Sequence, residues 1–357
     1  MSKKKYKRLE KINYSLFNFH AIKAAYIHVS NVCNFQCKIC KLPKTKKKSF
    51  VPLGILKKKI RKAVELELDN LIFTGQEVIL HPDIDKIIKF SFEKCKANYI
   101  TFNTNGLAFS NDLIWQRLRS VKEYLDRVYI AVSINFYNQR TFNSWSGHRG
   151  KIFNEWCSGF KKAIDSFLKI SSVDIILKKD KDIIKIIDFL NDISNKKHDY
   201  PEGLRIINLM PFGYTKGRVY QRLKYNLTET NKQILKIVKK YPDKIHFEGF
   251  PICLFNQQDL KNEKYFIYNF HLDFKKGVLI QYDLNIYETY FPGPTENWTI
   301  NQKELFDAYN KMFCYVDECQ DCFYKNKCYG IQKEYLKCYS EESVNKEVKL
   351  LKSINWR

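Results

Sequence analysis

Short apolar runs alternate with amphipathic segments along the chain as far as residue 209. Runs rich in β-branched and aromatic residues predict strands, and segments with apolar residues at helical spacing predict helices. The predicted strands are 26–29, 70–74, 99–102, 128–134, 173–177 and 204–209. The predicted helices are 55–68, 84–94, 153–168 and 183–193. This alternation predicts an α/β fold, a partial (β/α)6 TIM-like barrel whose working face lies at the carboxyl ends of the strands.

Three cysteines follow the first predicted strand. Cys33, Cys37 and Cys40 are spaced C-x3-C-x2-C. A structural zinc site uses four protein ligands, whereas three thiolates leave one iron of a [4Fe-4S] cluster open for another ligand. The triplet therefore indicates a cluster that binds a further molecule, with a zinc knuckle or chance clustering as the alternatives.

The triplet after a first strand resembles the signature of the radical S-adenosylmethionine (radical SAM) enzymes. Phe35 fits this resemblance, because the family usually carries an aromatic residue near the second cysteine. The resemblance implies that Cys33, Cys37 and Cys40 hold a [4Fe-4S] cluster and that the open iron binds SAM. It also implies that one electron cleaves SAM to a 5'-deoxyadenosyl radical.

The end of the second strand resembles the Gly-Gly-Glu-Pro motif of the same family. Here the motif reads Gly75-Gln76-Glu77-Val78, so the glycine and the glutamate match, while Gln76 and Val78 depart from it. The resemblance implies that Gly75, Gln76 and Glu77 contact the methionine part of SAM. An ordinary strand-turn-helix junction is the alternative.

Polar residues also end the third and fourth predicted strands. Thr104-Asn105 followed by glycine, and Ser133, occupy places where the family contacts SAM. Asn-Gly is in addition a common turn dipeptide. The polar, aromatic stretch 137–150 is predicted to be a loop over the active site.

A second group of cysteines lies near the C-terminus. Cys319, Cys322 and Cys328 are spaced C-x2-C-x5-C, after an isolated Cys253 and a predicted β-hairpin at 273–291. The group resembles the SPASM and twitch extensions of radical SAM enzymes. That resemblance implies one auxiliary [4Fe-4S] cluster, held by these four cysteines.

Two departures from the full SPASM pattern argue against a second auxiliary cluster. Tyr282 and Gln332 stand where that pattern has cysteines. Cys314 and Cys338 are substitute ligands for the single cluster, and a structural zinc is the competing interpretation.

Length and composition set the expected organisation. A chain of 357 residues predicts one large α/β domain with an appendage. We expect a basic lead-in at 1–20, the barrel at 21–215, a linker helix region at 216–245 and the cluster extension at 246–357. No run of eighteen apolar residues and no secretion signal is present, so we expect a cytoplasmic protein with no membrane partner.

The formal net charge is +24. Such a charge attracts polyanions, although a sequence so rich in Lys, Ile, Asn and Tyr also matches a compositional bias of the genome. The alternative of another class is a zinc-bearing, basic nucleic-acid-binding protein. The strand and helix alternation is poorly explained by that alternative.

The expected function follows from the resemblance. We expect an enzyme that abstracts hydrogen from a peptide and oxidises or cross-links its side chains, with a small metabolite as the alternative substrate. A flavodoxin or ferredoxin is the expected reducing partner, and the hard chemistry belongs to the cofactors.

Overall fold

The computed structural model describes most of the barrel and the last part of the chain. The described residues are 24–37, 39–40, 48–65, 68, 70–166, 168–179, 182–194, 204–209, 217–241, 245–256, 266–268, 272–273, 277–278, 281–283, 312–325, 328 and 330–356. The predicted lead-in and part of the predicted hairpin lie outside these residues.

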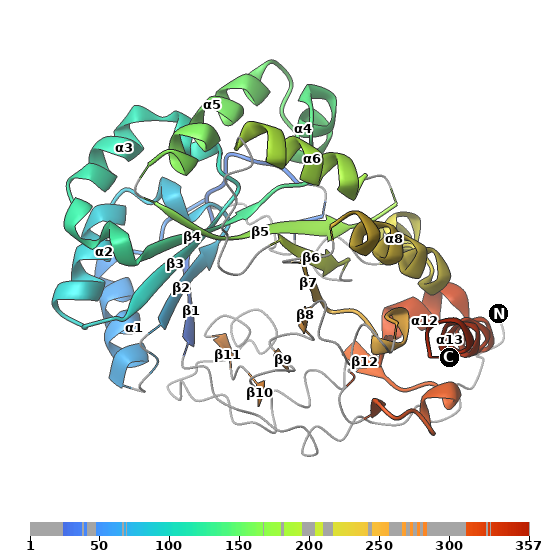
Figure 1. Cartoon of the computed structure of the whole chain (residues 1–357). Helices are drawn as coiled ribbons and strands as arrows, with labels where there is room; N and C mark the ends of the chain where they lie inside the picture. Colours follow the sequence, from blue (N-terminus) through green and yellow to red (C-terminus); the bar gives the residue numbers. More distant parts are fainter. Residues whose placement is uncertain are drawn as a thin grey trace.

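A curved sheet of parallel strands forms the centre of the molecule (Figure 1). Its strands β1 to β8 lie side by side in chain order, each parallel to the next. Their bounds are β1 Ala24–Ser30, β2 Asn70–Gly75, β3 Tyr99–Thr104, β4 Val128–Ser133, β5 Lys169–Leu177, β6 Leu204–Asn208, β7 Ile245–Glu248 and β8 Phe266–Tyr268. The predicted partial barrel is confirmed, and β7 and β8 extend the sheet beyond the six predicted strands.

The segment after β8 contributes strands at both edges of this sheet. β9 (Leu272–Asp273) pairs antiparallel with β8 and with β10 (Gly277–Val278), so the predicted hairpin is present. β11 (Gln281–Asp283) pairs parallel with β1 at the opposite edge. The two edge strands of the sheet, β10 and β11, are therefore separated by only two residues in the sequence.

Helices cover the outer face of the sheet, where α1 to α6 lie in Figure 1. The helices of this part are α1 Leu53–Glu65, α2 Ile84–Glu93, α3 Asp112–Arg119, α4 Gln139–Ser146, α5 Ile152–Ile164, α6 Ile183–Ile193, α7 Arg218–Leu223 and α8 Leu227–Lys240. Short 3-10 turns are η2 Val78–Leu80, η3 Leu107–Ser110, η4 Lys122–Arg127 and η5 Ile252–Leu254.

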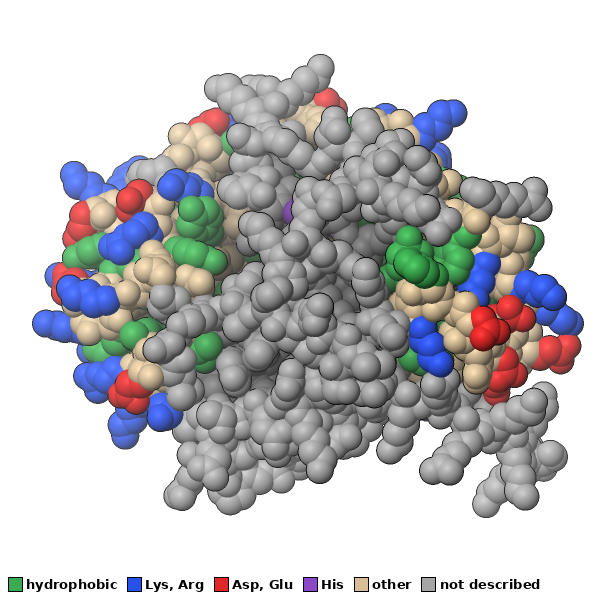
Figure 2. All heavy atoms as spheres, turned by 60° about the horizontal axis from the view of Figure 1, so that its bottom comes forward, with side chains coloured by type: hydrophobic (Ala, Val, Ile, Leu, Met, Phe, Trp, Pro, Cys, Tyr) green, Lys and Arg blue, Asp and Glu red, His purple; other side chains and the backbone are tan. Residues whose placement is uncertain are grey.

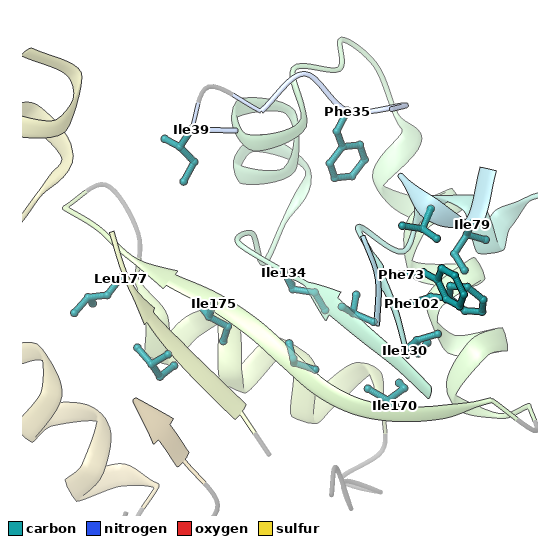
Figure 3. Close-up of a cluster of buried hydrophobic side chains, with 14 of the residues drawn as sticks. Phe35, Ile39, Phe73, Ile79, Phe102, Ile130, Ile134, Ile170, Ile175 and Leu177 are labelled. Atoms are coloured by element: carbon teal, nitrogen blue, oxygen red, sulfur yellow. The ribbon is translucent and has the colours of Figure 1, made fainter. Parts of the chain in front are cut away.

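The strand faces that meet these helices are apolar. On β1, Ala25, Ile27 and Val29 are fully buried, while the residues between them are partly exposed. Phe73 and Phe102 of neighbouring strands stack with their ring centroids 5.3 Å apart (Figure 3). Because side chains alternate along a strand, the other face of the sheet is left for polar groups inside the barrel.

The prediction that 137–150 is a loop is wrong in its central part, which forms α4. Asn138 and Thr141 build a reciprocal capping box at the start of this helix. Phe142 and Trp145 are buried on its inner face. The polar composition of the stretch obscured this short amphipathic period.

The cysteine-rich tail packs beside α8 (Figure 1). It contains β12 (Phe313–Cys314), the turn η6 (Asp317–Cys319), β13 (Ile331–Gln332), α12 (Lys333–Tyr339) and α13 (Glu341–Asn355). β12 and β13 form a two-stranded antiparallel sheet, and α13 contacts α8 and η5. Among the described helices, none has both the length and the apolar character that crossing a membrane requires.

The described charged side chains are mixed on the face drawn in Figure 2. Lys and Arg side chains lie over the part formed by α1 to α3, interspersed with Asp, Glu and apolar residues. Where opposite charges alternate in this way, the local field is weaker than the net charge suggests.

Candidate active site

The ends of β1 and β2 approach each other closely at Gly75. Gly75 has φ of +142°, and a Cβ atom there would lie 2.6 Å from the carbonyl oxygen of Ser30. The backbone N–H groups of Gln76 and Glu77 donate to the carbonyl oxygens of Ser30 and Val32, both at 2.9 Å. Only glycine fits this approach, and it joins the start of the cysteine loop to the end of β2.

Glu77 is fully buried and connects the ends of β2 and β3. Its carboxylate accepts hydrogen bonds from the Thr104 hydroxyl at 2.6 Å, from the Asn105 backbone N–H at 2.8 Å and from the Ile79 backbone N–H at 3.3 Å. Burial raises the pKa of Glu77 to about 7, although these hydrogen bonds oppose the shift. The carboxylate therefore fixes the geometry of two strand ends.

Asn105 connects β3 to the cysteine loop. Its side-chain Nδ2 donates to Asn34 Oδ1 at 2.7 Å and to Cys33 Sγ at 3.7 Å. Its backbone carbonyl accepts from Trp156 Nε1 at 2.8 Å. The Phe35 backbone N–H also donates to Cys33 Sγ, at 3.3 Å. The sulfur of Cys33 is thus held by two N–H donors.

The three cysteines of the loop are partly exposed. Burial and the nearby Glu77 charge raise the pKa of Cys33 to about 12, and Cys40 lies close enough to Cys33 to add to that shift. The Cys40 backbone N–H donates to the Cys37 carbonyl at 3.3 Å. Three thiols on one loop, with N–H donors already at one sulfur, fit a three-cysteine [4Fe-4S] site.

α4 supports the cysteine loop from its other side. The Phe35 ring packs edge-on against Phe142 and His148, at centroid distances of 5.5 and 5.7 Å. The Gln36 backbone N–H donates to the Ser146 carbonyl at 2.5 Å. Gly147 has φ of +76°, and a Cβ there would lie 2.8 Å from Gln36 Cβ. Phe35 thus anchors the loop to α4, and its contact with SAM remains a prediction.

Ser133 ends β4 beside a charged network inside the barrel. In the register of the sheet, Ser133 pairs with Asp174 and Asp174 pairs with Arg205. The Arg205 guanidinium donates to both Asp174 carboxylate oxygens, at 2.8 and 2.9 Å, and lies 4.0 Å from Glu248. Asp174, Arg205 and Glu248 were not predicted from the sequence. The feature that could have indicated Asp174 and Arg205 is a charged residue within a predicted apolar strand.

Four cysteines of the C-terminal region line one cavity. Cys253 follows β7 in η5, and Cys319, Cys322 and Cys328 come from the tail. The backbone N–H groups of Ile252 and Gly330 both donate to Cys328 Sγ, at 3.4 and 3.3 Å. The structure thus brings together the four cysteines that the resemblance to SPASM and twitch extensions predicted as a set.

The electrostatics of this cavity fit a metal cluster. Burial raises the pKa of Cys328 to about 12 and that of Cys319 to about 11. The pKa of Cys253 is raised well above its usual value by burial and then by the other three thiols, whereas Lys352 partly opposes the shift. Burial thus favours the neutral thiols, and their deprotonation at this site requires a cationic centre, such as a metal cluster, to offset the buried negative charge.

A [4Fe-4S] cube and a structural zinc ion are the two candidates for this cavity. In the described part of the chain, no three His, Cys, Asp or Glu side chains are placed to hold one metal ion. A [4Fe-4S] cube separates its ligands, because each cysteine binds a different iron. The two predicted substitutes, Cys314 and Cys338, are not among the residues that line the cavity.

Comparison with known proteins finds one matching family model and curated relatives of low sequence identity. Residues 27–190 match the family model of the Radical SAM superfamily. The GTP 3',8-cyclase of Clostridium acetobutylicum is 30% identical over 205 residues, which are 54% of this chain and 59% of that protein. The GTP 3',8-cyclase of Vibrio parahaemolyticus is 26% identical over 258 residues, which are 70% of this chain and 72% of that protein.

Two solved structures are similar in fold to nearly the whole chain. Streptococcus suis SuiB bound to precursor peptide SuiA matches with a TM-score of 0.58 and 15% identity, covering 92% of this chain and 75% of SuiB. Native anSMEcpe with bound AdoMet and Kp18Cys peptide matches with a TM-score of 0.52 and 13% identity, covering 92% of this chain and 99% of that one. At these identities the likeness concerns the fold.

Proposed function

We propose that this chain, which belongs to the radical SAM superfamily, is an enzyme that oxidises or cross-links side chains of a peptide. The observation that carries the proposal is the cavity lined by Cys253, Cys319, Cys322 and Cys328. A cube with four thiolate ligands has no open iron for a substrate, so its remaining role is electron transfer or structural support.

The first site in this proposal is formed by the ends of β1 to β4. Cys33, Cys37 and Cys40 hold the SAM-binding [4Fe-4S] cluster, which supplies the electron that cleaves SAM. The contacts to SAM come from side-chain or backbone atoms at the strand ends, namely Gly75, Gln76, Glu77, Thr104, Asn105 and Ser133. The hydrogen bonds among Glu77, Thr104 and Asn105 support this assignment, because they fix adjacent strand ends in one geometry.

The second site makes a net oxidation possible. Removal of one hydrogen atom leaves a peptide radical, which is not yet a stable product. Loss of a second electron and a proton completes a two-electron oxidation, and a cluster held by Cys253, Cys319, Cys322 and Cys328 would accept that electron. An oxidised electron-carrier protein would then take that electron, while a flavodoxin or ferredoxin is the reducing partner that would supply the electron for SAM cleavage. Lys325 and Lys352 line the cavity, and their charge favours the reduced, more negative cluster.

A nucleotide is the second candidate substrate. The identity to GTP 3',8-cyclases favours it, but in the two relatives compared that identity spans 54% and 70% of this chain. The likeness to SuiB and anSMEcpe, both solved with peptides, spans 92% of the chain. The longer likeness supports the peptide.

The test uses reconstituted, reduced protein with SAM, and adds either GTP or synthetic peptides encoded by short reading frames beside the gene. We expect the peptides to raise 5'-deoxyadenosine formation above the background, and one peptide to lose two hydrogen atoms in mass. Stimulation by GTP with none by peptides would overturn the peptide proposal. Absence of SAM cleavage under both conditions would overturn the enzyme assignment at this site.

A further inference from the structure

Asn105 has a hydrogen-bond partner for each of its polar atoms. Its backbone N–H donates to Glu77, and its backbone carbonyl accepts from Trp156. Its side-chain Oδ1 accepts from the Leu107 backbone N–H at 3.0 Å, and Nδ2 donates to Asn34 and Cys33. These contacts involve the turn after β2, α5, η3 and the cysteine loop, and they place one amide at one sulfur.

The orientation of the amide is fixed by its neighbours. The Leu107 backbone N–H can only donate, so the atom facing it must be the carbonyl oxygen. The NH2 group then faces Asn34 Oδ1 at 2.7 Å and Cys33 Sγ at 3.7 Å. Asn34 Oδ1 and Cys33 Sγ therefore both accept from this NH2 group.

We propose that Asn105 sets the reduction potential of the cluster held by Cys33 through this N–H···S hydrogen bond. The inference rests on the cluster assignment in the proposed function. Reduction adds one negative charge to the cluster, and part of that charge lies on the cysteine sulfurs. A donor at the sulfur stabilises the reduced form more than the oxidised form, so it raises the potential.

Substitution of Asn105 changes only one of the two N–H donors at Cys33 Sγ, so its effect on the reduction potential is specific to this side chain. The second donor to Cys33 Sγ is a backbone N–H, that of Phe35, which no substitution of Asn105 removes. Asn105 is therefore a positioning residue, and its amide is the tunable part of the environment of Cys33. A low potential makes the electron harder to supply, so the same hydrogen bond decides how readily a partner reduces the site.

Two variants remove the donor in different ways. Asn105→Asp keeps the oxygen that accepts from Leu107 but has no N–H, and Asn105→Leu has no polar atom in its side chain. Both variants are expected to lower the equilibrium constant for reduction of the cluster about tenfold. For one electron, this corresponds to a reduction potential lower by about 59 mV. Asn34→Ala is the control, because it removes the other partner of the same NH2 group and leaves the donor to Cys33 in place.

The measurement is a redox titration of the full chain followed by electron paramagnetic resonance. The signal that changes on addition of SAM identifies the SAM-binding cluster. If either Asn105 variant retains the cluster and its equilibrium constant for reduction is within twofold of the wild-type value, the inference is refuted. An equal shift of the potential in Asn34→Ala would also refute it.

If Cys33→Ala keeps the SAM-sensitive signal, the cluster assignment fails instead. Should both Asn105 variants lose the cluster, the wild-type N–H···S coupling, measured by 15N pulsed resonance on protein labelled at asparagine side chains, decides between presence and absence of the bond.

Discussion

The Glu77 carboxylate accepts the backbone N–H of Asn105 at 2.8 Å, although the two residues are 28 positions apart. Parallel pairing of β2 with β3 brings the two strand ends to one edge of the sheet. The same carboxylate also accepts the hydroxyl of Thr104, so one buried acid organises the end of β3. Two neighbouring residues of the proposed SAM site, Thr104 and Asn105, thus depend on a single side chain.

Glu77→Ala should disrupt this site. The change leaves the Thr104 hydroxyl and two backbone N–H groups without their acceptor inside the protein, which costs about 2–5 kcal/mol of unfolding free energy. We expect SAM affinity to fall at least tenfold, measured by isothermal titration of reconstituted protein. Asp83→Asn is the matched control, since Asp83 follows the same loop and pairs with the exposed Lys86. Equal SAM affinity in Glu77→Ala and wild type would contradict the role given to Glu77.

Gly75→Ala should be destabilising because the backbone at Gly75 admits no side chain. A Cβ 2.6 Å from the Ser30 carbonyl oxygen forces the ends of β1 and β2 apart, and φ of +142° adds strain of about 1–3 kcal/mol. Urea unfolding under anaerobic conditions should show this loss, together with reduced cluster content. Gly54→Ala in α1 is the control, because nothing lies within 4 Å of its added Cβ. That change should stabilise the chain by about 0.5–1 kcal/mol. A neutral Gly75→Ala would show that the strand ends are not closely joined.

Iron analysis tests both cysteine sites. Two cubes predict about eight irons per chain, and replacing Cys33, Cys37 and Cys40 together by alanine should leave about four. Cys253→Ala should remove the auxiliary cluster or leave it with an open iron, and should lower iron content or change its resonance signal. Cys338→Ala is the control, since Cys338 does not line the cavity. A colourless protein with one zinc per chain would instead support the structural-zinc interpretation.

Local features of the fold and of the site were predictable from the sequence, but their contacts were not. The strands follow from local pattern, because a buried parallel strand leaves a signal within a few residues. The Gly75 and Glu77 positions came from the resemblance to a motif of the radical SAM family. The partners of Glu77 do not, since they depend on the register between β2 and β3. The ion pair of Asp174 with Arg205 joins two strands in the same way. The convergence of Cys253 with Cys328 depends on how the tail packs after α8, and it was expected only from the resemblance to SPASM and twitch extensions.

Lys224 provides a test of burial by pH. Its side chain is buried, its ammonium group donates to Asn208 Oδ1, and it lies 5.9 Å from the centroid of the Phe250 ring. Burial lowers the pKa of Lys224 from 10.5 to about 7. Between about pH 7 and 10.5 the unfolded chain therefore binds a proton at Lys224 that the folded chain has lost. Stability gained from this group rises with pH across that window and is lowest below about pH 7.

Lys224→Met should remove this pH dependence. The free energy of unfolding of wild type relative to the variant should increase between pH 7.5 and 9.5, with a slope of at most about 1.4 kcal/mol per pH unit for one proton. Urea midpoints at several pH values measure the difference, and other titrating groups cancel because both proteins contain them. Lys232→Met on the exposed face of α8 is the control, with a pH dependence expected to match wild type. A pH-independent difference between wild type and Lys224→Met would mean that Lys224 keeps its proton when buried, so that Asn208 and Phe250 stabilise the ammonium form enough to offset the loss of water.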